Sequence, residues 1–361
     1  MRVGICGAGL GGLSAAVGLK ALGFDVAVFE RSPVLRATGA GLMLWPNGVR
    51  ALYGLGLKEQ IDAISVKIER YYNYDAAGNL LFEKDTSDWP RKYGAPAIGV
   101  HRSALTSMLA DSYGTDLIRF DHEVVSVENG SDKAVCHFSN GSSYEGDFII
   151  AADGIFSAVR EKLVGGVRFQ PNEHHAYRWR AIFNLEQLDI DPAAQTGFYA
   201  PGGWIAFLPI GNGKAYWFGS VSGANNPNEF LDYFSSWTNT PVSGAFSITP
   251  KDAIIQSSLD VPEGLPEKWT HGRITLLGDA AHPPVPDLAQ GAGQALIDSR
   301  VLRDVFAETS DVDEALATYE DKRLKAAYYV VKCSQQGSYL GRNRVDPIVV
   351  RYEREIEAMG V

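Results

Sequence analysis

Residues 2–30 read RVGICGAGLGGLSAAVGLKALGFDVAVFE, and this stretch decides the fold of the chain. The short apolar run over 2–6 predicts a strand, the glycine-rich turn leads into a helix over 13–22, and 25–30 predicts a second strand. Strand, glycine turn, helix and strand within about thirty residues make a βαβ unit. The N-terminal part of the chain is therefore expected to form a parallel sheet.

Glycines occupy the three positions of the turn that a bound pyrophosphate needs. Gly7 permits the tight turn, Gly9 lets the backbone approach the pyrophosphate, and Gly12 lets the helix pack closely on the sheet. The helix N-terminus offers unpaired N–H groups and the positive end of its dipole to the phosphates. Glu30 ends the second strand, where an acid accepts hydrogen bonds from a ribose and disfavours a 2′-phosphate. The turn therefore predicts a site for FAD or NAD.

Composition and charge narrow the class of protein. The chain has 361 residues, of which 45% are hydrophobic and 21% charged, and this excludes a disordered, collagenous or coiled-coil protein. At roughly 100–200 residues per domain, the length suggests two domains, or one large domain with an insertion. The formal net charge of −10 disfavours nucleic acid as a partner. An anionic ligand would therefore need a local site built from backbone amides or a few arginines.

The cysteines and the apolar runs indicate in which cellular compartment the protein is expected. Cys6, Cys136 and Cys333 are widely scattered and form no Cys-x-x-Cys pair, so neither a disulfide framework nor a metal site is expected. No uninterrupted apolar run reaches the roughly 18 residues that a membrane-spanning helix needs. The expectation is a cytoplasmic protein with no membrane partner.

Two further motifs follow predicted strands. Residues 152–160 read ADGIFSAVR and residues 277–291 read LGDAAHPPVPDLAQG. Each places an acid and a glycine at the carboxyl end of a strand, where open α/β sheets bind ligands. Taken singly, an Asp-Gly pair after a strand is more often just a turn.

Together and in this order, the three motifs resemble the class A flavoprotein monooxygenases, the para-hydroxybenzoate hydroxylase-like family of FAD-dependent aromatic hydroxylases. The resemblance covers nearly the whole chain, and Pro46-Asn47 heading a helix and His101-Arg102 before another agree with it. It implies that Glu30 holds the adenosine ribose and that Asp279 holds ribityl or ribose hydroxyls. The cofactor contacts that it implies are Gly7, Gly9, Leu10, Gly11, Gly12, Glu30, Arg31, Arg36, Gly41, Arg102, Val125, Asp153, Gly154, Gly278, Asp279, Pro286, Gln290, Gly291 and Ala292.

The sequence departs from the family pattern at two places. Ala289 stands where a glycine is usual before Gln-Gly, which puts the backbone beside the flavin ring in question. Ile297 replaces an acidic residue commonly found before Asp298, and this change is expected to affect packing only.

The resemblance also implies a reaction. NAD(P)H reduces FAD, dioxygen adds to give a flavin C4a-hydroperoxide, and an electron-rich aromatic or N-heteroaromatic ring is hydroxylated. The segment from Pro283 to Gly291 is expected to line the flavin ring. The catalytic candidates are Arg180, Tyr216 and Pro283, and the candidates for the substrate pocket are Trp45, Tyr199, Phe207 and Pro284. Core packing is the alternative for Trp45, and a solvated side chain is the alternative for Arg180.

The expected fold is α/β: a Rossmann-like FAD-binding domain with a βαβ unit and a mixed sheet, a mainly antiparallel β substrate domain, and C-terminal helices. The FAD-binding domain is discontinuous and takes 1–70, 99–172 and 272–361. The substrate domain takes 71–98 and 173–271, where aromatic, alternating runs predict antiparallel strands.

Other functions on this fold stay open. A flavin dehydrogenase or reductase would share the cofactor site, and a non-catalytic dinucleotide sensor would need no cradle like 278–291 for a flavin ring. The run from Trp204 to Pro209 is similar to a signature of flavin-dependent halogenases, but the second tryptophan of that signature is absent. The substrate, the choice between NADH and NADPH, and the choice between monomer and homodimer stay open as well.

Overall fold

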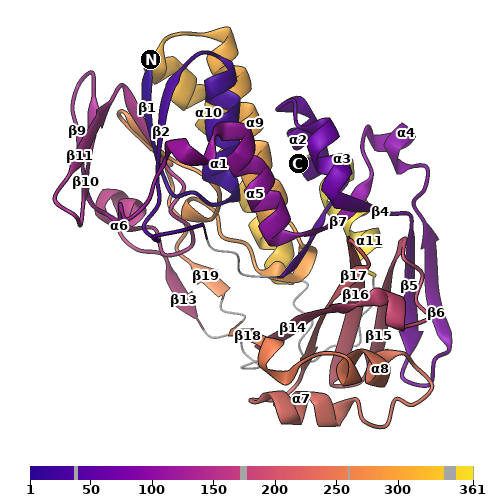
Figure 1. Cartoon of the computed structure of the whole chain (residues 1–361). Coiled ribbons are helices and arrows are strands. Elements are labelled where there is room, and N and C mark those ends of the chain that lie inside the picture. Colours follow the sequence, from indigo (N-terminus) through magenta and orange to yellow (C-terminus); the bar gives the residue numbers. More distant parts are fainter. Residues whose placement is uncertain (36–39, 171–176, 259–260, 337–346, 361) are drawn as a thin grey trace.

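The computed structural model describes residues 1–35, 40–170, 177–258, 261–336 and 347–360, and its elements form two lobes (Figure 1). A six-stranded sheet in the order β20-β21-β12-β1-β2-β8 organises the first lobe. β1 pairs in parallel with β2 and β12, whereas β20 and β21 pair antiparallel, so the sheet is mixed as expected. The bounds are β1 Arg2–Cys6, β2 Asp25–Phe29, β8 Ile118–Arg119, β12 Phe148–Ala151, β20 Thr270–His271 and β21 Ile274–Leu276.

Helices α1 (Leu10–Ala21), α5 (Arg102–Tyr113), α9 (Gly291–Glu308) and α10 (Val312–Gln336) pack in this lobe. Leu13 and Leu19 of α1 are fully buried beside Ile5 of β1, in one continuous apolar core. The first turn of α1 lies directly on the turn that precedes it: a Cβ atom on Gly12 would stand 1.9 Å from the carbonyl oxygen of Gly7. Only glycine allows this approach, as the sequence predicted.

A seven-stranded sheet in the order β18-β14-β17-β16-β15-β5-β6 forms the second lobe. Its pairings are antiparallel except that of β15 with β5. The bounds are β5 Arg70–Asp75, β6 Leu80–Asp85, β14 Tyr177–Asn184, β15 Ala194–Ala200, β16 Gly203–Gly211, β17 Lys214–Val221 and β18 Ile255–Ser258. α7 (Pro227–Tyr233) and α8 (Val242–Ser247) cover one face through an aromatic core that includes Trp179, Trp217 and Phe230 (Figure 1).

A three-stranded sheet, β3-β7-β4, joins the two lobes. β7 packs so closely on β16 that a Cβ atom on Gly99 would lie 1.9 Å from the carbonyl oxygen of Pro209. The indole of Trp45 stacks on Tyr352, near the C-terminus, with ring centroids 4.4 Å apart. The bounds here are β3 Gly41–Leu44, α2 Pro46–Gly54, α3 Lys58–Ile64, β4 Ser65–Ile68, α4 Trp89–Tyr93, β7 Ala97–His101 and α11 Ile348–Arg351.

Smaller elements complete the fold. β9 (Val124–Asn129), β10 (Ala134–Phe138) and β11 (Ser143–Gly146) form an antiparallel sheet, and β13 (Arg168–Gln170) pairs with β19 (Val261–Glu263). α6 (Ala158–Val164) follows β12. The Sγ atoms of Cys6 and Cys136 lie 3.5 Å apart as free thiols.

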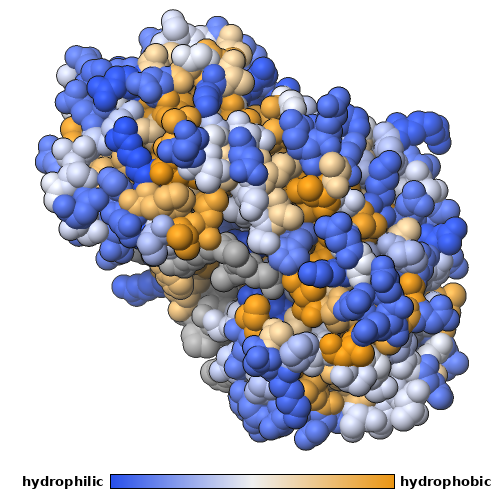
Figure 2. Space-filling model, in the orientation of Figure 1, coloured by the Kyte–Doolittle hydropathy of each residue, from blue (hydrophilic) through white to orange (hydrophobic). Residues whose placement is uncertain are grey.

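Hydrophilic residues dominate the face of the molecule seen in Figure 2, and apolar residues gather there in small patches between them. Among the described helices, none has the length and apolar composition that crossing a membrane requires.

Candidate functional site

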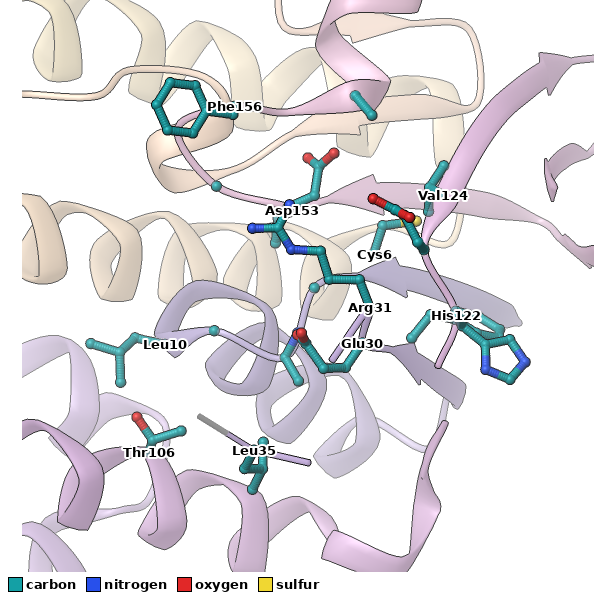
Figure 3. Close-up of a pocket in the computed structure, with 18 of the residues that line it drawn as sticks. Cys6, Leu10, Glu30, Arg31, Leu35, Thr106, His122, Val124, Asp153 and Phe156 are labelled. Carbon is teal, nitrogen blue, oxygen red and sulfur yellow. The ribbon is translucent and has the colours of Figure 1, made fainter. Parts of the chain in front are cut away.

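The carboxyl ends of β1, β2 and β12 open onto a cavity of about 310 Å³, which we call the first cavity. Figure 3 shows side chains from the ends of these strands converging on it, with Glu30 and Asp153 on separate loops. Of the residues proposed from the sequence, it collects Gly7, Gly9, Leu10, Glu30, Arg31, Arg102, Asp153 and Gly154. The first and second motifs therefore share one site.

The backbone of the first turn fits a close ligand. Gly7 has a φ of +107°, and a Cβ atom there would lie 2.3 Å from the carbonyl oxygen of Ala152, so a side chain is excluded. At Gly9 the opposite holds: no heavy atom of the described chain, beyond its neighbours in sequence, lies within 4 Å of a Cβ position. Gly9 is thus not required by packing, and it leaves open space beside the N-terminus of α1, where a phosphate gains most from the helix dipole.

The two acids of the first cavity differ in their hydrogen bonds. Glu30 accepts from the backbone N–H of Ala8 at 3.0 Å and of Ser32 at 2.9 Å, which fixes its carboxylate at the end of β2. Asp153 accepts from the N–H of Val159 at 3.2 Å, but its Oδ1 is buried and has no partner among the described residues. Burial raises the pKa of Asp153. An unpaired buried carboxylate oxygen calls for a ligand donor such as a hydroxyl.

A second cavity of about 370 Å³ adjoins the first and shares Gly9, Leu10, Arg102 and Gly154 with it. It reaches from the first turn and the third motif to the open face of the seven-stranded sheet. Of the residues proposed from the sequence, it gathers Gly9, Leu10, Gly11, Gly41, Arg102, Gly154, Arg180, Tyr199, Tyr216, Gly278, Asp279, Pro284, Pro286, Gly291 and Ala292. All three motifs therefore border this space together with the aromatic sheet.

Arg160 ties the second motif to the third. Its side chain is buried and donates to the carbonyl oxygens of Ile155 at 2.8 Å and Ala280 at 2.9 Å. Burial raises the pKa of Asp279, while His282, Arg102 and Arg160 act in the opposite direction. We assigned Arg160 no role from the sequence, although it stands within the second motif. An arginine three residues after a helix-capping serine gives no sign that it will turn inward.

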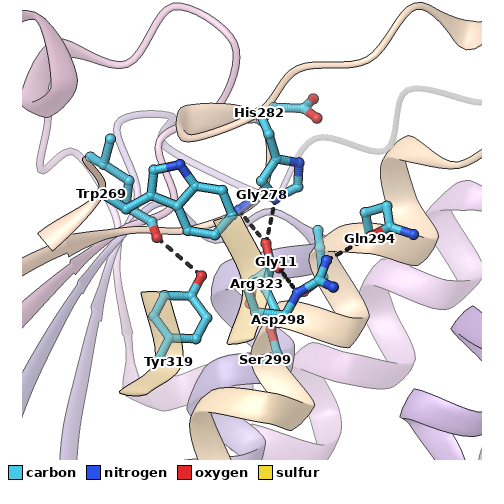
Figure 4. A network of polar contacts seen from close by, with 12 residues as sticks. Gly11, Trp269, Gly278, His282, Gln294, Asp298, Ser299, Tyr319 and Arg323 are labelled. Carbon is cyan, nitrogen blue, oxygen red and sulfur yellow. Dashed lines mark hydrogen bonds and ion pairs between the residues drawn. The ribbon is translucent and has the colours of Figure 1, made fainter. Parts of the chain in front are cut away.

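A buried polar network centred on Asp298 supports the third motif (Figure 4). Asp298 accepts from the N–H of Gly278 at 2.9 Å, and its carboxylate lies 2.6 Å from Nε2 of His282 and 2.7 Å from Nε of Arg323. Burial opposes ionisation of Asp298, but His282 and Arg323 outweigh this effect and lower its pKa. Arg323 also donates to Gln294 at 2.6 Å.

The network continues to the N-terminus of α9. Nε2 of Gln294 donates to Oε1 of Gln290 at 3.0 Å, and Asn47 donates to the same oxygen at 3.0 Å. Arg323 thereby connects both walls of the second cavity that the third motif provides, at Gly278 and at Gly291. The sequence carried a signal for Arg323, because it stands on the buried stripe of α10 between Tyr319 and Ala327.

Two arginines of β14 reach the second cavity from the sheet. Arg178 forms a buried ion pair with Asp287 at 2.5 Å, and its guanidinium lies 4.5 Å from the ring centroid of Trp204. Arg180 and Tyr216 line the same cavity. Burial raises the pKa of Tyr216, and Arg180 is the largest opposing influence.

The site fits an adenine dinucleotide with a flavin ring. The open space at Gly9 and the unpaired oxygen of Asp153 stand where a pyrophosphate and hydroxyl groups would bind, and the second cavity of about 370 Å³ adjoins them. Residues 1–334 match the family model described as FAD binding domain. The chain belongs to this FAD-binding family.

Relatives and solved structures agree with membership of this FAD-binding family. The chain is 30% identical over 353 residues to the aurachin C monooxygenase/isomerase of Stigmatella aurantiaca, covering 95% of this chain and 90% of that protein. It is 30% identical over 335 residues to an FAD-dependent urate hydroxylase of Klebsiella pneumoniae, covering 90% and 86%. The crystal structure of Klebsiella pneumoniae HpxO complexed with FAD and uric acid matches with a TM-score of 0.86 and 28% identity, covering 99% of this chain and 91% of that one. The protein is an FAD-dependent flavoprotein of the monooxygenase class, as the resemblance implied.

Some residues proposed for the pockets pack elsewhere. Phe207 is fully buried on the other face of the sheet, against Phe183 and Phe198, because strand alternation turns Ala206 and Leu208 toward the cavity side. Trp45 is buried in the core, and its Nε1 donates to the carbonyl oxygen of Leu288 at 2.9 Å. The structure thus places Phe207 away from the second cavity, and for Trp45 it supports the alternative of core packing.

Other proposed residues border neither cavity. The side chain of Val125 is exposed, and its neighbour Val124 lines the first cavity instead. Gly12 serves packing, and Pro283 and Gln290 lie behind residues that line the second cavity. Arg36 lies outside the described residues. The FAD contacts themselves stay predictions.

The two departures from the family pattern have local consequences. Ala289 adopts a φ of +49°, a left-handed conformation that glycine accommodates more easily, and it lines the second cavity. Ile297 is half-buried and packs against the core of the first lobe.

Substitution of the two turn glycines is expected to separate packing from cofactor binding. Gly12→Ala should lower the free energy of unfolding of the apoprotein by at least about 1–3 kcal/mol, because its Cβ has no room. Gly9→Ala should change it by less than about 1 kcal/mol, yet weaken FAD binding at least about tenfold because the methyl group occupies the phosphate space. Urea denaturation and fluorescence titration with FAD measure the two quantities. Equal FAD affinity of Gly9→Ala and wild type would contradict the assignment.

Replacing Arg323 tests the network in Figure 4. Arg323→Met should leave Asp298 with His282 as its one ion-pair partner among the described residues and lower the free energy of unfolding by about 3–5 kcal/mol. It should also shift the visible absorption of bound FAD, because Gly278 and Gln290 lose the support that Arg323 gives them through Asp298 and Gln294. Arg351→Met is the matched control, since Arg351 is a buried arginine that pairs with Glu355 and lines neither cavity. A flavin spectrum that shifts equally in both variants would refute a role for Arg323 in positioning.

Proposed function

We propose that this protein is an NAD(P)H-driven monooxygenase that hydroxylates an aromatic or heteroaromatic small molecule. The observation that carries the proposal is the second cavity, which joins the residues of the three FAD motifs to an aromatic, arginine-bearing sheet face. A flavin ring and a flat substrate would there lie within one enclosure. The urate hydroxylase and the other hydroxylating relatives support this assignment.

We also propose that the chain divides as the sequence suggested, with 71–98 and 173–271 forming the substrate domain. In support, the hairpin β5–β6 shares a sheet with β14–β18 although it precedes them by about a hundred residues in the chain. Cytoplasmic location and a monomer or homodimer remain part of the proposal, and the free thiols agree with a reducing compartment.

Bound FAD would supply the activation of dioxygen after its reduction by NAD(P)H. The chain would contribute orientation and exclusion of water. Glu30 and Asp153 would accept hydrogen bonds from cofactor hydroxyls, and the N-terminus of α9 at Gly291 would face negative charge on the ring edge. The apolar side chains of Leu208 and Phe218 would keep water from the reacting ring.

Arg180 and Tyr216 are the proposed catalytic pair. Both line the second cavity, and Arg180 is close enough to oppose the rise in the pKa of Tyr216, so a substrate hydroxyl placed between them could relay its proton through the Tyr216 hydroxyl while Arg180 stabilises the negative charge left on the substrate oxygen. Pro284 lines the same space and Pro283 lies behind it, so Pro283 would act through the loop and not by contact.

One assay tests the function. The purified protein should be yellow, and it should consume dioxygen with NADH or NADPH in amounts that match hydroxylated product for at least one member of an aromatic substrate panel. A yellow protein that oxidises such a substrate without using dioxygen would instead be a dehydrogenase. A colourless protein that does not bind added FAD would refute both.

Tyr216→Phe tests the catalytic pair. With a substrate found in the panel, we expect kcat to fall about 10²-fold with a KM within about threefold of wild type, because a proton relay is lost and binding is not. Tyr233→Phe is the control, since Tyr233 belongs to α7 on the far side of the sheet. An unchanged kcat in Tyr216→Phe would remove Tyr216 from the mechanism.

A further inference from the structure

The seven-stranded sheet presents one face to the second cavity. Side chains alternate along each strand, so on β15 Thr196 and Phe198 turn toward the helices while Gln195 and Tyr199 turn toward the cavity. On β16, Trp204 and Leu208 share that side, and on β17 Tyr216 and Phe218 do. This face forms the wall on which a substrate would rest.

Aromatic side chains make up much of this wall. Tyr199 and Trp204 stack with ring planes 21° apart, and Tyr216 and Phe218 stack with planes 17° apart. Trp204 meets Phe218 edge to face with centroids 5.7 Å apart. Aromatic rings in these arrangements favour a planar aromatic ligand over an aliphatic one.

Gln195 is the polar exception at the β15 end of the wall. It is 5% exposed and lines the cavity, and its Oε1 has no hydrogen-bond partner within the described part of the chain. Leaving a buried carboxamide oxygen unpaired costs about 1–3 kcal/mol, so the site gains by accepting a ligand donor. A carboxamide carries one acceptor and one pair of donors side by side. A ligand edge that carries an N–H next to a carbonyl group can therefore pair with both the oxygen and the NH₂ group of this side chain.

The β14 end of the wall differs in charge. Nη1 of Arg178 and Nε of Arg180 are also buried, without partners among the residues described. Arg178 is neutralised by Asp287, whereas for Arg180 the structure shows no carboxylate pair among these residues. This end suits a ligand oxygen that carries partial or full negative charge.

From this arrangement we propose that the substrate is a planar N-heteroaromatic lactam, a ring with adjacent N–H and C=O groups, and that Gln195 binds this edge. The inference rests on the proposed function, which it narrows from aromatic compounds in general to lactams. Gln195 is a specificity-determining residue in this scheme: it selects a ring N–H that phenols and benzoates lack.

Matched ligands test the inference on the FAD-loaded enzyme. The probes are 6-hydroxynicotinate in its lactam form, its N-methyl lactam, and 4-hydroxybenzoate, which has the same carboxylate and ring size without a ring N–H. Titration of the flavin absorption should give a Kd for the lactam at least about tenfold below those of the other two, because only the lactam satisfies Gln195.

Variants then assign the preference to one side chain. Gln195→Met keeps the length of the side chain and should bring the three Kd values within about twofold of each other. Thr196→Ser alters the next residue of β15 on the opposite face and should leave the preference unchanged. If Gln195→Met does not fold, Gln195→Glu replaces it and should raise the Kd of all three anionic probes through charge repulsion, and unchanged Kd values would contradict a place for residue 195 beside the ligand.

The outcomes separate this inference from the proposed function. Equal affinity for the lactam and 4-hydroxybenzoate, no binding of the lactam, or an unchanged preference in Gln195→Met would each overturn the role of Gln195. Hydroxylation of a phenol or benzoate in those cases would leave the monooxygenase function standing. Tight binding of the lactam without hydroxylation of any compound in the panel would instead overturn the function and keep the binding site.

Discussion

The contact between Gly12 and the carbonyl group of Gly7 is the constraint on which the rest of the site depends. With no room for a Cβ atom at Gly12, α1 begins immediately on the turn and its N-terminus is fixed above the end of β1. β2 and β12 flank β1 in parallel, so their carboxyl ends bring Glu30 and Asp153 to the same edge. The positive end of the α1 dipole and the two acidic side chains therefore border the same cavity.

Buried charges hold the loops around that space. Arg160 bridges the loops after β12 and β21, and Asp298 with Arg323 fixes the loop after β21 to α9. Buried ion pairs contribute little net stability, because desolvation offsets the attraction between the charges. Their consequence here is geometric: each partner would be left as an unpaired buried charge if the loops moved apart.

The seven-stranded sheet has two faces with different tasks. One packs on α7 and α8 through a continuous aromatic core, and the other presents separate aromatic side chains, two arginines and Gln195 to the second cavity. The polar groups that remain unpaired on the second face are costly unless a ligand satisfies them. These unpaired polar groups would destabilise a packed core, but on a cavity wall they are available to bind a ligand.

The sequence by itself determined the βαβ unit, the mixed sheet, the FAD-binding family and the enzyme class, because glycine spacing and strand-terminal acids are local requirements of backbone and phosphate geometry. Local pattern left Trp45 open between the pocket and the core, and it placed Phe207 in the pocket although the orientation of a strand residue depends on which face of the sheet meets the core. Tertiary structure alone decided that Arg160 and Arg323 turn inward and that Gln195 lines the substrate wall. Arg160 and Arg323 take their places from partners far away in the chain, and Gln195 takes its place from the cavity that its sheet borders, and such placements leave no periodic trace in the sequence around them.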